Sequence, residues 1–143
     1  MRTAEIHLLQ EVMRETERTL NAIDILSDKV YDTDLSLQLS RQSIKYSQIK
    51  NDAAEKLVEN KAEGYRSSAV SRLAQNVDLN SRTLLKTSTG HVAKMLIQNS
   101  NNNIIELEKA LRHSEERDGE AVHMAKQMIA FEEKNIRILK DYL

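Results

Sequence analysis

Apolar side chains recur at steps of three and four along most of the chain, which is the spacing of one face of an α-helix. The first such stretch runs to about Lys29, with Thr3 as its expected N-cap. Its apolar face consists of Ile6, Leu9, Met13, Thr16, Leu20, Ile23 and Val30. We expect the opposite face to be a solvated surface of mixed charge, formed by Glu11, Arg14, Glu15, Glu17 and Arg18.

A second helix is predicted after a very short turn, starting at Asp32 or Thr33 and ending near Glu63. Its inward stripe consists of Leu35, Leu39, Gln42, Tyr46, Ile49, Ala53 and Leu57. Gly64 would end this helix as a C-terminal glycine cap. The next segment, 65–81, has helical spacing behind an N-cap at Ser67 and favours a short separate helix. Two alternatives stay open for it, a crossover along the bundle and an early part of the third helix.

The third core helix, from about Arg82 to about Arg117, has an almost wholly polar centre at 98–103. One reading of its buried stripe is Leu85, Val92, Leu96, Ser100, Asn103, Leu107 and Leu111, and the neighbouring stripe carries Asn99, Asn102 and Glu106. Asp118 and Gly119 then make a turn, with Asp118 as the expected N-cap of a fourth helix. Its stripe is Ala121, Ala125, Met128, Glu132, Ile136, Leu139 and Leu143.

Composition agrees with this pattern, because the chain has no proline, only three glycines and many good helix formers. Four long helices with mostly short connections predict an all-α protein, a four-helix bundle about 40 Å long. At 143 residues the chain, 1–143, is expected to be a single domain.

The middle of each predicted helix carries a polar side chain, and these should meet in one layer at the centre of the bundle. The layer comprises Thr16, Tyr46, the segment 99–103 and Glu132. Buried polar groups need partners, so such a layer can fix the register of the helices. It can also hold a small ligand or a metal, for which the candidate residues are Tyr46, Asn99, Asn103, Glu106 and Glu132.

Two sequence motifs resemble parts of known sites, one for binding metals and one for phosphotransfer. Di-metal bundles use two Glu-x-x-His motifs, and this chain has one, Glu120 to His123, at a helix end. We therefore expect no metal site and no cofactor. His91 and Lys94 have the spacing of phosphotransfer bundles, but Met95 stands where those sites carry glycine. A structural role for His91 is favoured, with phosphotransfer as an alternative.

The net charge of −1 and the absence of basic aromatic patches argue against nucleic acid as a partner. No run approaches the ~20 apolar residues of a membrane span, and the N-terminal stretch lacks the apolar core of a signal peptide. The chain has no cysteine, which fits a reducing compartment. A cytoplasmic location is the expectation.

Three stretches, Thr83 to Leu111, Ile23 to Gln42 and Ala130 to Leu143, resemble a small bacterial ferritin-like four-helix family of unknown function, with members in clostridia. The resemblance implies a ferritin-like fold and carries no activity with it. Without paired Glu-x-x-His motifs, iron oxidation or storage is not expected. We therefore expect a non-catalytic bundle that acts by protein interaction or by self-association as a homodimer, with no identified small molecule. The alternatives are a divergent ferritin-like protein that binds a metal or small ligand in the polar layer, and phosphotransfer through His91.

Overall fold

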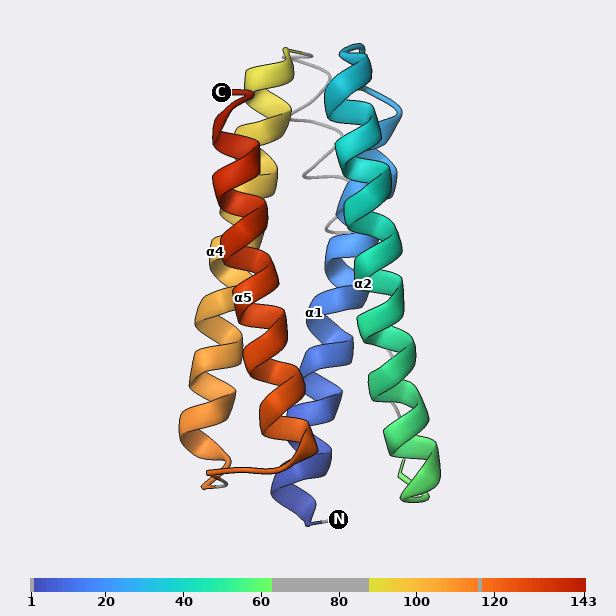
Figure 1. The fold of residues 1–143 in the computed structure, drawn as a ribbon, viewed down its shortest axis with the longest axis vertical. Coiled ribbons are helices and arrows are strands. Elements are labelled where there is room, and N and C mark those ends of the chain that lie inside the picture. Colours follow the sequence, from blue (N-terminus) through green and yellow to red (C-terminus); the bar gives the residue numbers. More distant parts are fainter. Residues whose placement is uncertain (1, 63–87, 116) are drawn as a thin grey trace.

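The computed structural model describes residues 2–62, 88–115 and 117–143. Within them the chain forms four helices and no strand: α1 (Thr3–Ser27), α2 (Thr33–Glu59), α4 (Thr89–His113) and α5 (Glu120–Lys140). The four lie side by side as one bundle (Figure 1), which confirms the all-α four-helix prediction. The short helix expected at 65–81, the cap expected at Gly64 and the expected helix start at Arg82 lie outside the described residues.

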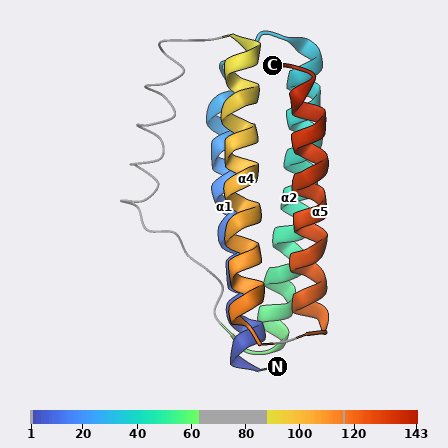
Figure 2. The same cartoon turned by 90° about the vertical axis from the view of Figure 1, so that its left-hand side faces the viewer.

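The helices occupy the four corners of the bundle. Figure 1 sets α4 and α5 apart from α1 and α2, and Figure 2 sets α1 and α4 apart from α2 and α5. Helices α1 and α5 run in one direction, and α2 and α4 run in the other. The end of α2 and the start of α4 consequently lie at opposite ends of the bundle. Helix α1 contacts all three of the others.

The ends of α2 show both a confirmed and a wrong prediction. Asp32 caps its start, because the carboxylate Oδ1 accepts a hydrogen bond of 2.8 Å from the Leu35 N–H. The helix ends at Glu59 rather than near Glu63, since Lys61 takes the left-handed conformation with φ 56°. The N–H of Ala62 then bonds to the Leu57 carbonyl at 2.8 Å, which closes the helix as a Schellman motif.

The start of α5 differs from the prediction by one residue. Gly119, with φ 117°, occupies the N-cap position, and it makes no side-chain cap. The Asp118 carboxylate accepts instead from the N–H of Gly119 itself at 2.8 Å. Helix α4 begins with a side-chain cap, because the Ser88 hydroxyl accepts from the His91 N–H at 3.2 Å.

Helix α1 buries a wider face than the sequence pattern predicted. Besides the expected stripe, it buries a second one formed by Leu8, Val12, Glu15, Thr19, Ala22 and Leu26. Glu15 is fully buried, so its assignment to the solvated surface was wrong. The physical reason is that α1 packs against three helices, which leaves only a narrow strip for solvent. Among the described residues, none of the helices is long and apolar enough to cross a membrane.

Candidate functional site

A hydrogen-bonded cluster of polar side chains lies in the core at the middle of the bundle. Glu132, on α5, is fully buried and accepts from two other helices. The Tyr46 hydroxyl, from α2, donates to its Oε1, and the Asn103 amide, from α4, donates to its Oε2. The Asn135 amide donates in turn to the Tyr46 oxygen at 3.0 Å. Phe131 packs edge-on against the Tyr46 ring, with ring centroids 4.9 Å apart.

Helix α1 joins the same cluster through Thr19. Its hydroxyl oxygen accepts from the Asn103 amide at 2.7 Å and from the Asn99 amide at 2.9 Å. All four helices therefore contribute to one connected set, which we call the polar core network. It consists of Thr19, Tyr46, Asn99, Asn103, Glu132 and Asn135.

A second buried carboxyl lies beside the network on α1. Glu15 accepts from the Arg18 guanidinium at 2.6 Å. Burial, together with the neighbouring Glu11 carboxylate, raises the pKa of Glu15 to about 8, although the Arg18 charge lowers it. Burial, and then the nearby Glu15 charge, raise the pKa of Glu132 to about 9, against a lowering contribution from Asn135. Both carboxyls consequently hold a proton at neutral pH.

A protonated Glu132 needs an acceptor as well as donors. Asn103 offers one, since its Oδ1 is buried and has no hydrogen-bond partner. A half-turn of the Asn103 amide brings this oxygen toward Glu132, where it can accept the acid proton. Two further buried atoms beside the network, Oε2 of Glu15 and Nε2 of Gln42, also lack a partner.

The structure brings together most of the residues predicted for the layer. Tyr46 or Thr16 was expected to lie within hydrogen-bonding range of Asn99, Asn103 or Glu132, and the bond from Tyr46 to Glu132 confirms this. Thr16 is buried, but its hydroxyl bonds to the carbonyl of Met13 on its own helix at 2.8 Å.

Glu106 does not join the polar core network. Its side chain is 38% exposed and lies 3.7 Å from the Lys109 ammonium. The reason is helix phase: Ser100, Asn103 and Leu107 are the buried positions of α4, and Glu106 lies on the neighbouring flank.

Sequence reasoning missed Glu15, Thr19 and Asn135. For the first two a signal existed, because the stripe from Leu8 to Leu26 repeats at steps of four and three. Glu15, the charged member of this stripe, led to its assignment to the solvated surface. Asn135 lies three residues after Glu132, on the same helix face.

The motifs considered for metal binding and for phosphotransfer lie away from the polar core network. Glu120 and His123 are exposed at the start of α5, and Glu120 pairs with Lys56 at 3.1 Å. His91 is half-buried, and its Nε2 is buried without a partner. Gly90 has a packing role, since a Cβ there would lie 3.2 Å from the Leu143 carbonyl carbon. Across the described ranges, no group of three or more His, Cys, Asp or Glu is arranged to hold a metal ion.

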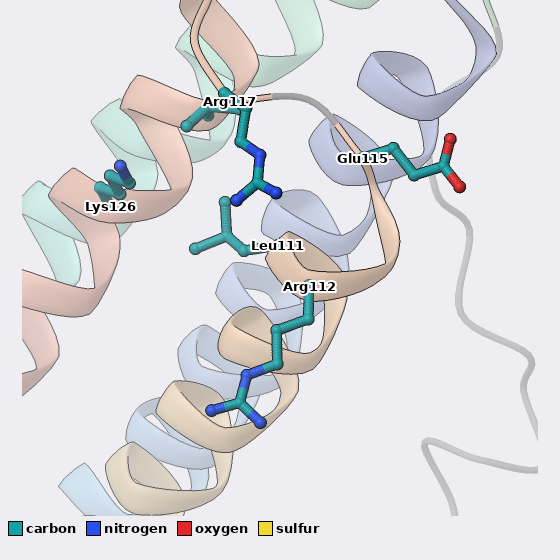
Figure 3. Close-up of a pocket in the computed structure, with 6 residues that line it drawn as sticks. Leu111, Arg112, Glu115, Arg117 and Lys126 are labelled. Carbon is teal, nitrogen blue, oxygen red and sulfur yellow. The ribbon is translucent and has the colours of Figure 1, made fainter.

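A surface hollow of about 430 Å³ lies between the end of α4 and the start of α5. It is lined by Leu111, Arg112, Glu115, Arg117, Val122 and Lys126. Figure 3 shows Arg117 directed toward Leu111, while Glu115 points away. The hollow shares no residue with the polar core network.

The chain was compared with protein-family models, with curated proteins and with solved structures, and none of the three comparisons gives a match.

Proposed function

We propose that this chain is a non-catalytic, cytoplasmic helical bundle that acts by binding a protein through the outer face of α2. The observation that carries the proposal is a row of exposed apolar side chains. Leu37, Ile44 and Val58 are 54%, 62% and 73% exposed. They are separated by seven and fourteen residues, so they lie along one side of the helix.

Single exposed apolar residues are common, but an aligned row of them is the pattern of a helix–helix seam. Small side chains lie between them: Ser40 and Ser47 come three residues after Leu37 and Ile44, and Ala54 comes four residues before Val58. Small side chains there allow a second helix to approach closely. We call the whole row the α2 seam: Leu37, Ser40, Ile44, Ser47, Asn51, Ala54 and Val58.

The polar core network supports a scaffold role. The side chains of the network donate most of their hydrogen bonds to one another, and each helix supplies at least one side chain. Polar layers of this kind fix helix register, because any slip leaves buried groups unpaired. A rigid register keeps the α2 seam straight and available to a partner.

We further propose that the bundle is ferritin-like, in line with the resemblance of its sequence. Ferritin-like bundles have one long crossover, which makes their second and third core helices run in the same direction. The common direction of α2 and α4 supports this arrangement.

A second candidate function is binding of a cation or small polar ligand in the core. It is favoured by the unpartnered Oε2 of Glu15 and Oδ1 of Asn103. Metal analysis of the purified protein tests it, followed by melting with added divalent cations. Stoichiometric metal, lost from Glu15→Gln and Glu132→Gln variants, would establish this function in place of the first.

Photo-crosslinking in cells tests the proposed interaction. A photoreactive residue replaces Gln48, which is exposed beside the α2 seam, and the control carries it at Lys134, exposed on α5. We expect a covalent protein adduct from position 48 and none from position 134. Adding Ile44→Asp should abolish the adduct while circular dichroism stays unchanged. No adduct at position 48, or one insensitive to Ile44→Asp, refutes the proposal.

A further inference from the structure

The α2 seam is self-complementary, and we infer that its occupant is a second copy of this chain, paired antiparallel about a midpoint at Ile49. This inference rests on the proposed function and names its partner. In this register Ile44 lies opposite Ala54 of the second copy, and Val58 lies opposite Ser40 of the second copy. Each contact occurs twice, as a two-fold axis requires.

Side-chain volume favours the antiparallel arrangement. Ile44 and Val58 each meet a small member of the seam, so these layers have similar total volume and the helices can lie close together. Leu37 lies opposite Lys61, just past the end of α2. In a parallel pair, Ile44 would meet Ile44 of the second copy, and Ser47 would meet Ser47. Wide and narrow layers would then alternate and leave gaps. Asn51 adds a polar match, because in the antiparallel register it lies opposite Ser47 of the second copy.

Charge gives the second argument. Arg41 and Glu55 flank the seam on the same side, each seven residues from Gln48. Both are exposed, and within the described ranges neither has an ion-pair partner. Antiparallel pairing brings Arg41 against Glu55 of the second copy on both sides of the axis.

The opposite flank carries one charge that works against pairing. Lys50 approaches Lys50 of the second copy, but each ammonium already lies 3.3 Å from its own Glu17. That ion pair reduces the repulsion. In a parallel pair Glu55 would instead have to compete with Glu17 for Lys50, and Arg41 would face a serine.

The size of the seam sets the expected strength. From Leu37 to Val58 it extends for about 32 Å along a helix about 10 Å wide. Such a contact falls below the standard interface of roughly 1,600 Å² of total buried area. A dimer held by it should dissociate in the micromolar range rather than be permanent.

Charge reversal in the intact chain tests the register. Sedimentation equilibrium should show a monomer–dimer equilibrium for the unaltered protein. Arg41→Glu and Glu55→Arg should each weaken the dimer on the order of ten-fold, and the double variant Arg41→Glu/Glu55→Arg should restore it. Lys134→Glu is the matched control and should change nothing. A monomer at every concentration, or a dimer indifferent to both single reversals, overturns the inference.

Disulfide formation tests the orientation, since the chain has no cysteine of its own. Ser47→Cys and Asn51→Cys chains are mixed and oxidised, and intact mass identifies the products. The antiparallel pair predicts the mixed disulfide; a dominant Asn51→Cys homodisulfide would mean parallel pairing and contradict the inference.

The photo-crosslinking adduct separates the two proposals. An adduct that contains only a different protein defeats the second copy and leaves the proposed function standing, whereas no adduct defeats both.

Discussion

Replacing Glu132 by Gln should stabilise the bundle at neutral and alkaline pH and weaken its dependence on pH. Burial raises the pKa of the Glu132 carboxyl to about 9 in the folded protein, with the charge of Glu15 as the second cause. In the unfolded chain the same group titrates near 4.5. The folded protein therefore keeps a proton that the unfolded chain releases, and this difference favours unfolding as the pH rises.

The magnitude follows from the width of that pH range. Below pH 4.5 both states hold the proton, so the group has no effect on the free energy of unfolding. Between about pH 4.5 and 9 that free energy falls by about 1.4 kcal/mol per pH unit, and above pH 9 the loss levels off. From pH 5 to 7 Glu132 should cost about 3 kcal/mol, and Glu15, whose pKa is about 8, a similar amount.

The side chain of Gln matches Glu132 in shape and can preserve the polar core network. The new amide oxygen accepts from Tyr46, and its NH₂ group can donate to Asn103 after a half-turn of the Asn103 amide. The substitution therefore removes the titration with little loss of packing.

Urea unfolding at pH 5, 6, 7 and 8 measures the effect. We expect the stability of Glu132→Gln relative to the unaltered protein to rise by about 3 kcal/mol between pH 5 and 7. Glu133→Gln, at the exposed neighbouring position, is the control and should leave the slope unchanged. Equal slopes for the unaltered protein and Glu132→Gln would show that Glu132 is ionised in the folded state and refute the reasoning.

Three further predictions concern single positions. Tyr46→Phe should lower the free energy of chemical unfolding by about 1–3 kcal/mol, because it leaves a carboxyl oxygen of Glu132 and the Asn135 amide buried and unpaired. Tyr31→Phe, at an exposed position, is the control and should leave that free energy unchanged. Lys61→Gly should raise the melting temperature, corresponding to roughly 1 kcal/mol, since glycine adopts the φ of 56° freely; an unchanged or lower melting temperature would contradict that assignment. His91 should acquire no acid-labile phosphate from a phosphorylated response-regulator domain, because its Nε2 is buried, and phosphate lost in His91→Gln would show the opposite.

The hydrophobic pattern alone determined the helices and most of the polar layer. Steps of three and four predicted the four helices, although Thr3, expected as an N-cap, is the first residue of α1 and Arg2 is its cap. Tyr46, Asn103 and Glu132 were found because they interrupt otherwise apolar stripes at the middle of their helices. A polar residue at such a position stands out locally, so no knowledge of the neighbouring helices is needed.

Tertiary structure decided which faces are buried and which polar groups meet. Glu15 belongs to the core only because α1 packs against three helices, and no local pattern gives that number. Glu106 and Asn103 both fitted a candidate stripe, and the rotation of α4 against α1 and α5 selected Asn103. Helix ends also depended on backbone conformations such as the left-handed Lys61. Periodicity is a property of one helix, whereas burial and hydrogen-bond partners depend on how several helices are placed around it.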